Sequence, residues 1–167
     1  YQDMGTILFD ADGDGGLDLY VGRGGYQSKP NSIGYQDQFY INDGKGNFTL
    51  DSLALPANFT SKSCVRAIDY DNDGDLDLFI AGRVDPWSYP KPVSSFIYRN
   101  DSKDGHIKFT NVTAQVAKDL KNVGLVCDGM FTAFDNDGCL DLVVAGVWVP
   151  LTFCKTYKGF LVNVKGN

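Results

Sequence analysis

Short apolar runs, separated by turns that contain Gly, Asn and Asp, follow one another along the chain in a repeating order. Each repeat predicts a strand entering an Asp-rich loop, a strand leaving it, a third strand after a polar or Pro-rich connection, and a fourth after a tight turn. The strands that enter the loops are expected at residues 6–9, 64–68 and 130–134, and the third strands at 38–42, 95–99 and 151–155. Fourth strands are expected at 48–50 and 107–111. The pattern therefore predicts an all-β chain.

One segment departs from the strand pattern. Within residues 113–122, Val116 and Leu120 have helical spacing, so we expect a short helix or turn between the second and third repeats. The composition argues against long helices, because all 21 acidic residues are Asp, which favours caps, turns and metal loops. Nineteen Gly residues, with 11 Phe and 9 Tyr residues, suit short twisted strands and their turns.

The Asp-rich loops are similar to one another. They occupy residues 10–18, 69–77 and 133–141, and they begin 59 and 64 residues apart. This spacing is the length of one four-stranded sheet with its connections, somewhat above the roughly 40 to 50 residues of other β-propeller blades. We therefore expect a single propeller segment over residues 1–167, built of about three four-stranded blades. The blades are expected at 1–53, 54–113 and 114–167.

The first two loops carry Asp at positions 1, 3, 5 and 9 and Gly at position 6. Calcium takes about six to eight oxygen ligands, and alternating carboxylates on a tightly turned backbone bring several of them to one point. In the first loop the expected ligands are the side chains of Asp10, Asp12, Asp14 and Asp18 and the carbonyl of Gly16. In the second loop they are the side chains of Asp69, Asp71, Asp73 and Asp77 and the carbonyl of Asp75.

The third loop departs from this pattern, because Ala133 stands at its first position. The remaining candidate ligands are the side chains of Asp135, Asp137 and Asp141 and the carbonyl of Cys139. Losing one charged ligand weakens a calcium site. We expect two calcium sites, in the first and second loops, and a third site that is weaker or absent.

Two other interpretations of the loops compete with this one. An EF-hand shares Asp at positions 1, 3 and 5 and Gly at position 6, but it needs a Glu at position 12 and flanking helices. Position 12 is Val21, Ile80 or Val144, in an expected strand, so we reject the EF-hand. An acidic turn without metal would leave several carboxylates repelling one another. That alternative stays open above all for the third loop.

The motif Asp-x-Asp-x-Asp-Gly-x-x-Asp, repeated at blade spacing and followed by a strand that ends in Gly, resembles the FG-GAP or VCBS repeats of integrin-α-like β-propellers. In those repeats the hairpin between the first two strands of a blade binds calcium. Within that family the chain is most similar to secreted bacterial propellers of the UnbV and cartilage-acidic-protein type, through residues 35–48, 83–92 and 146–150. Val147 stands where that type usually carries an acidic residue. The resemblance covers nearly the whole chain.

The resemblance implies an exported protein, extracellular or at the cell surface, whose propeller supports adhesion, carbohydrate handling or assembly. We expect a calcium-binding module for extracellular binding, adhesion or scaffolding, with a protein or carbohydrate ligand. The alternative is a fragment of a calcium-dependent polysaccharide lyase or hydrolase, and an integrin-like adhesion partner is a third hypothesis. Known propellers have at least four blades. Further blades or a second chain are therefore expected to close the ring.

Charge and hydropathy argue against other classes of protein. The net charge of -6, from 15 basic and 21 acidic residues, argues against a nucleic-acid partner. No apolar run approaches the about 18 residues that span a bilayer, and the first residues lack the basic and apolar regions of a signal peptide. His106 is the only histidine and is expected at the surface, which leaves no base for a Ser-His or Cys-His pair. Catalysis therefore has no support in the sequence.

The Pro-rich loop at residues 83–92 carries Trp87 and Tyr89, either as a stacking platform for a sugar or peptide or as a rigid connection whose aromatics pack locally. Trp148 is expected to pack within a blade. Four widely spaced cysteines do not form a disulfide framework, so we expect free thiols. Glycosylation sequons, which matter only in a eukaryotic secretory pathway, occur at Asn47, Asn58, Asn100 and Asn111.

Overall fold

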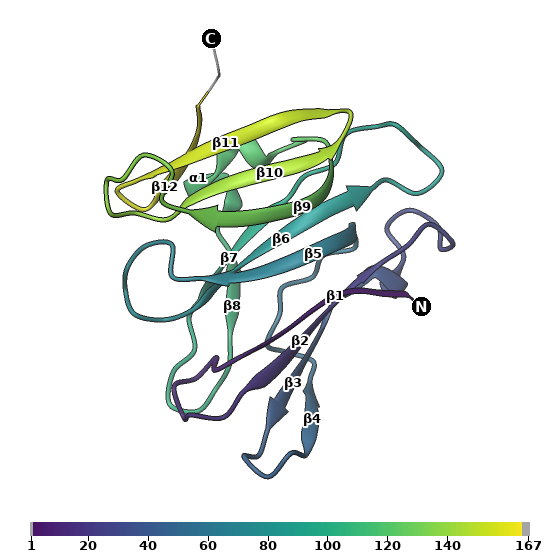
Figure 1. Cartoon of the computed structure of the whole chain (residues 1–167). Coiled ribbons are helices and arrows are strands. Elements are labelled where there is room, and N and C mark those ends of the chain that lie inside the picture. Colours follow the sequence, from purple (N-terminus) through teal and green to yellow (C-terminus); the bar gives the residue numbers. More distant parts are fainter. Residues whose placement is uncertain (1, 165–167) are drawn as a thin grey trace.

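The computed structural model describes residues 2–164 and shows a mostly β chain with one curled eight-stranded mixed sheet and one four-stranded antiparallel sheet (Figure 1). The larger sheet contains β1 (Gln2–Phe9), β2 (Asp18–Gly24), β3 (Gln38–Asn42), β4 (Phe48–Asp51), β5 (Ser61–Ile68), β6 (Asp77–Val84), β7 (Phe96–Asn100) and β8 (Phe109–Asn111). The smaller sheet contains β9 (Leu125–Thr132), β10 (Asp141–Val147), β11 (Val149–Tyr157) and β12 (Phe160–Val164). The short helices are η1 (Ile33–Tyr35), α1 (Thr113–Val116) and η2 (Lys118–Leu120). Tyr1 and residues 165–167, at the ends of the expected outer blades, lie outside the described residues.

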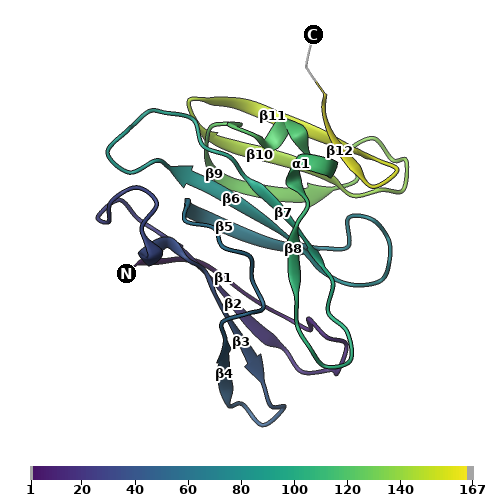
Figure 2. The same cartoon turned by 180° about the vertical axis from the view of Figure 1, so that it is seen from behind.

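Each strand pairs antiparallel with the next one in three successive groups of four, which we call the first (β1–β4), second (β5–β8) and third (β9–β12) units. The first two units join into one sheet through a parallel pair between Gly24 of β2 and Lys62 of β5. Figures 1 and 2 show the three units stacked one above another. The three Asp-rich loops, which follow β1, β5 and β9, lie on the same side of this stack, at the left in Figure 1.

The core consists of two apolar layers, one between each pair of neighbouring units. Alternate side chains of a strand point to opposite faces of its sheet. In the first layer, Tyr20 and Phe39 of the first unit are fully buried together with Leu78, Ile80 and Tyr98 of the second unit. In the second layer, Phe79 and Ile97 of the second unit are fully buried together with Leu142, Val144 and Cys154 of the third unit. Each internal face of the stack is thus covered by its neighbour.

A charged pair is buried between the first and second units. Lys62 is 1% exposed, and its Nζ lies 3.2 Å from Oδ1 of Asp37. The same Nζ donates to the carbonyls of Tyr35 and Asn58, at 2.5 and 2.6 Å. The hydroxyl of Tyr20 donates to Oδ2 of Asp37 at 2.6 Å. Both charges therefore have the additional hydrogen bonds that a buried ion pair requires.

The expected order of strands is confirmed, with longer strands before the loops than the apolar runs indicate. Residues 113–122 contain α1 and η2, so the helical interpretation of that segment is confirmed as well. The sequence pattern implied a fourth strand in the third repeat but did not locate β12, and it did not predict η1. The prediction that Trp148 packs within a blade is wrong, because this residue is 75% exposed at the turn between β10 and β11.

Several smaller features of the sequence also have a place in the fold. The four cysteines are free, and His106 is exposed. Asn58 and Asn100 are buried and cannot accept a glycan, whereas Asn47 and Asn111 are exposed. Residues 2–164 contain no helix with the length and apolar character of a membrane span.

Candidate metal centres

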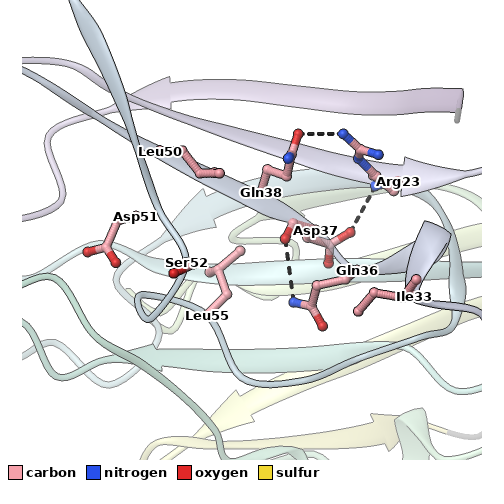
Figure 3. A pocket seen from close by; sticks show the side chains of 9 residues that line it. All are labelled: Arg23, Ile33, Gln36, Asp37, Gln38, Leu50, Asp51, Ser52 and Leu55. Carbon is pink, nitrogen blue, oxygen red and sulfur yellow. Dashed lines mark hydrogen bonds between the residues drawn. The ribbon is translucent and has the colours of Figure 1, made fainter.

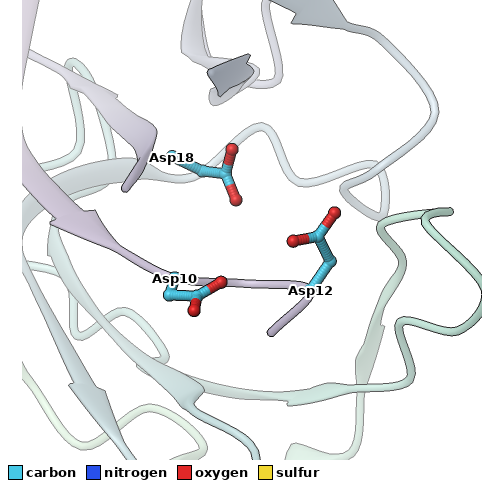
Figure 4. Close-up of side chains that lie close together, drawn as sticks. All are labelled: Asp10, Asp12 and Asp18. Atoms are coloured by element: carbon cyan, nitrogen blue, oxygen red, sulfur yellow. The ribbon is translucent and has the colours of Figure 1, made fainter. Parts of the chain in front are cut away.

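The first loop brings three carboxylates together. Asp10 follows β1, Asp12 lies in the turn and Asp18 begins β2, so the hairpin places all three around one point. One carboxylate oxygen from each lies within 4.8 Å of the other two. Figure 4 shows the three side chains pointing toward one another. This triad can hold a metal ion.

Backbone hydrogen bonds hold the first loop in this shape. The carboxylate of Asp10 accepts from the amides of Gly13 and Gly15, at 2.8 and 3.0 Å. Gly15 has a φ of +86°, a left-handed conformation that favours glycine. Asp14, which we expected as a ligand, accepts from the amide of Gly16 at 2.6 Å and is not part of the triad.

The second loop repeats the arrangement. Asp69, Asp71 and Asp77 form a second triad whose carboxylate oxygens lie within 4.8 Å of one another. Asp69 accepts from the amides of Asp73 and Gly74, both at 3.1 Å. Asp73 accepts from the amide of Asp75 at 3.0 Å and, like Asp14 in the first loop, stands outside the triad. The carbonyl ligands expected at Gly16 and Asp75 stay predictions.

The last Asp of each loop is buried beneath it and hydrogen-bonded to the third strand of its unit. The carboxylates of Asp18, Asp77 and Asp141 accept from the amides of Asn42, Asn100 and Thr156, at 2.9, 2.7 and 2.8 Å. The side chains of those three residues donate to the carbonyls of Leu17, Leu76 and Leu140, at 3.0, 3.2 and 2.6 Å. Sequence reasoning did not single out this contact. Its only signal was the Asn-Asp pair that ends the third strand in the first two units.

Burial disfavours the ionised form of three Asp side chains in the first two loops. Burial raises the pKa of Asp18 above its ordinary value and raises that of Asp77 to about 7. Burial also raises the pKa of Asp71, with a further contribution from the negative charge of Asp73. Oδ1 of Asp71 is buried without a hydrogen-bond partner among residues 2–164. A bound divalent cation relieves each of these penalties, because it supplies the missing positive charge.

The third loop is different. Within the described part of the chain, its carboxylates do not gather into a group of three, whereas those of the first two loops do. Asp135 accepts from the amide of Asp137 at 3.1 Å, and Asp137 accepts from the amide of Cys139 at 2.9 Å. Asp141 remains fully buried at the base of the loop. The carbonyl ligand expected at Cys139 stays a prediction.

The aromatic residues of the Pro-rich loop are exposed, Trp87 by 58% and Tyr89 by 57%. The indole Nε1 of Trp148 donates to the hydroxyl of Tyr89 at 2.8 Å. Tyr89 also lines a pocket of about 470 Å³. The lining residues come from all three units: Met4, Gly25, Tyr26, Arg83, Val84, Tyr89 and Leu125. They lie toward the strand ends that are far from the Asp-rich loops.

A second pocket, of about 320 Å³, lies on the first unit (Figure 3). Its polar side chains are bound to one another. The amide of Arg23 donates to Asp37 at 2.8 Å, and its guanidinium donates to Gln38 at 2.5 Å. Gln36 donates to the carbonyl of Asp37 at 3.4 Å. Since Asp37 is also paired with the buried Lys62, we assign these groups a structural role.

Comparison with protein families gave one match, to the FG-GAP-like repeat, over residues 10–80. The match begins at the first Asp of the first loop and ends within β6, so both triads lie inside it. Comparison with curated proteins gave no match. Residues 10–80, with their two Asp triads, are an FG-GAP-like repeat.

Proposed function

We propose that the chain is a segment of a calcium-binding β-propeller that acts outside the cell in binding, adhesion or scaffolding. In this proposal each unit is one blade. The observation that carries it is the pair of Asp triads at equivalent positions of the first two units, inside the FG-GAP-like repeat. Calcium fits these triads because it is a hard cation that takes oxygen ligands in flexible geometry.

The proposed role of calcium is to fix the two hairpins. Each triad places three carboxylates close together, and their mutual repulsion opposes the loop conformation until a cation is bound. Because the folded loops bind the ion and the unfolded chain does not have them, binding stabilises the fold. The ion therefore has a structural role in this proposal.

The stacking of the units supports the propeller. Phe39 of the first unit and Ile97 of the second occupy the same strand position, and each is fully buried against the next unit. Phe153 occupies that position in the third unit and is 37% exposed. Exposed apolar rows of this kind mark surfaces that another part covers. We propose that further blades, in a longer chain or a second chain, cover it.

The proposed ligand-binding surface is the one that carries the exposed aromatic side chains. Trp87, Tyr89 and Trp148 are exposed on the strand ends remote from the calcium loops, and Arg83 lies in the same pocket wall as Tyr89. Exposed aromatic rings next to a cationic side chain suit the stacking of a sugar ring or an aromatic peptide side chain. A protein or carbohydrate ligand is proposed on this basis. The segments at 35–48 and 83–92 likewise support the assignment to exported propellers of the UnbV type.

The test of calcium binding is thermal melting in calcium and in chelator. Calcium at about 100 times its Kd stabilises the fold by about 2.7 kcal/mol per site. For a chain of 167 residues this corresponds to a rise of roughly 5–10 °C in the melting temperature per site. The variant with Asp12→Asn and Asp71→Asn removes one carboxylate from each triad and is expected to lose the rise.

The control variant, Asp51→Asn with Asp104→Asn, makes the same change of charge outside the loops and is expected to keep the rise. A melting temperature that calcium leaves unchanged in the unsubstituted protein would contradict the proposal. The ligand surface is tested separately, by screening glycans and peptides against Trp87→Ala and Tyr89→Ala. Binding that neither substitution weakens would remove these residues from the site.

A further inference from the structure

A lysine side chain contacts the third loop, whose first position lacks an Asp. Lys155 is on β11, and its Nζ lies 2.5 Å from Oδ2 of Asp135 and 3.2 Å from Oδ2 of Asp137. Its side chain is 37% exposed, and its ammonium group contacts both carboxylates. The negative charges of the loop therefore already have a positive partner within the chain.

The strand register shows that this partner is peculiar to the third unit. In each unit, the second residue of the second strand pairs with a residue of the third strand, which is Tyr40, Tyr98 or Cys154 in the first, second and third units. The residue that follows this partner in the sequence is Ile41, Arg99 or Lys155. Ile41 carries no charge. Arg99 carries one, but its Nε pairs with Asp101 at 2.7 Å. Tyr157 stands at the Asp101 position in the third unit, which leaves the loop carboxylates as the acidic partners of Lys155.

We propose that Lys155 serves as the cation of the third loop and closes it without a divalent ion. The inference rests on the proposed function only in so far as the other two loops take calcium. An ammonium group in contact with two of the three carboxylates repels a divalent ion electrostatically and occupies its ligands. Ala133, which removes the first carboxylate, and Lys155, which adds a positive charge, thus act in the same direction.

Two further observations concern the carboxylates that Lys155 contacts and the one that it does not contact. The amide of Cys139 and the ammonium group of Lys155 lower the pKa of Asp137, and the two carboxylates raise the pKa of Lys155, so the pair is held in its charged form. Oδ2 of Asp141, by contrast, is buried without a hydrogen-bond partner among the described residues. One carboxylate oxygen of the loop therefore remains for a cation to use if Lys155 is removed and an acidic residue is restored at position 133.

The experiment compares the number of calcium ions bound per chain, measured by equilibrium dialysis, in four proteins. They are the unsubstituted chain, Ala133→Asp, Lys155→Met, and the variant with both changes. The unsubstituted chain is expected to bind two calcium ions and the double variant three. The calcium affinity of the third loop in the double variant is expected to exceed that in the unsubstituted chain by at least about tenfold. Arg99→Met, the same change at the equivalent position of the second unit, is the control and is expected to leave the number at two.

Acetylation of Lys155, followed by mass spectrometry of the unsubstituted protein, provides a measurement that does not depend on any variant folding. The amine of Lys155 is expected to react more slowly than the amines of exposed, unpaired lysines. Its rate of acetylation is expected to be the same in calcium and in chelator. Three ions bound to the unsubstituted chain, a double variant that stays at two, or acetylation that calcium accelerates would each overturn the inference. An unsubstituted chain that binds no calcium, with Lys155 still protected in chelator, would overturn the proposed function alone.

Discussion

At the scale of single residues, Asp77 is both buried and a member of the second Asp triad. It is fully buried beneath the second loop, and burial raises the pKa of its carboxyl from the ordinary value of 3.8 to about 7. Without metal, this carboxyl therefore carries a proton in mildly acidic solution. Calcium must displace that proton, because a carboxylate binds metal in its deprotonated form.

We predict that the calcium affinity of the second loop falls about tenfold for each pH unit below the pKa of about 7 and is constant above it. The measurement is calorimetric titration from about pH 5.5 to about pH 8 in the Asp12→Asn variant, which leaves the second triad intact. An affinity that does not change between those limits would contradict the assignment of Asp77 as a ligand.

The same group sets the sign of the pH dependence of stability in chelator. Folded Asp77 holds its proton more tightly than the unfolded chain does, so its contribution to folding is present below the unfolded value of 3.8. That contribution is lost as the pH rises through about 7. The metal-free protein is expected to become less heat-stable over this range, and calcium is expected to remove the trend.

The buried Lys62 gives a second prediction at this scale. Lys62→Met leaves Asp37 as an unpaired charge in the layer between the first and second units. Breaking a buried pair in this way costs about 3–5 kcal/mol of unfolding free energy, which urea unfolding measures. Lys103→Met, in the exposed turn before β8, is the control and is expected to cost less than about 0.5 kcal/mol. Equal losses in the two variants would rule out a role for the buried pair.

What the sequence could predict about the site depends on how far apart its residues are in the chain. The members of each triad were among the four Asp ligands expected in each loop, because they all lie within nine residues, where spacing alone brings carboxylates together. Lys62 and Asp37 meet only because two units stack, and Lys155 meets its loop only through strand pairing. Contacts of this kind follow from packing and register, which no local pattern of residue types reveals.

At the scale of the elements, Asn100 ties loops from two units together. Its side-chain amide donates to the carbonyl of Ala11 in the first loop at 2.8 Å and to that of Leu76 in the second at 3.2 Å. Asn100 is 4% exposed, so water is largely excluded from this site. Removing the side-chain amide would therefore leave both carbonyls without a hydrogen-bond donor. The end of β7 thus contacts both Asp-rich loops.

We predict that Asn100→Ala lowers the unfolding free energy by about 1–3 kcal/mol and weakens calcium binding at both loops. Asn42→Ala is the matched variant: its amide donates to a single carbonyl, that of Leu17, at an exposed site, and water can replace it. Urea unfolding in chelator gives the stability, and calcium titration gives the affinities. Equal effects of the two variants would show that the contact between units does not matter.

The strands were located from the sequence except where the turn before a strand lacked the usual residues. The hairpins with Asn-Asp-Gly or Asp-Gly sequences were expected, because these residues adopt positive φ readily. The turn before β12 is formed by Lys158 and Gly159, whose φ values are 50° and 75°. Lysine is not a typical turn residue, so this hairpin gave no signal, and β12 was missed for that reason.

At the scale of the whole molecule, each end of the stack exposes apolar side chains. Leu78 and Tyr98 of the second unit are fully buried on the face toward the first unit. Leu142 and Cys154 of the third unit are fully buried on the corresponding face, toward the second unit. Leu8 and Leu50 lie in the equivalent row of the first unit and are 52% and 49% exposed. The first unit thus leaves uncovered the face that its two neighbours bury, and the third unit leaves uncovered the opposite face, which carries Phe153.

We predict that the 167-residue chain associates head to tail, with the third unit of one copy on the first unit of the next. Such a contact joins two different surfaces, so it continues until a ring closes. Light scattering over a range of concentrations is expected to give a mass above that of one chain, and Phe153→Lys is expected to reduce it. Leu53→Lys adds the same charge at an 87% exposed position in the connection between β4 and β5 and is expected to change nothing. A mass of one chain at every concentration would contradict this prediction. It would mean that the exposed faces of the first and third units bind other blades and not each other.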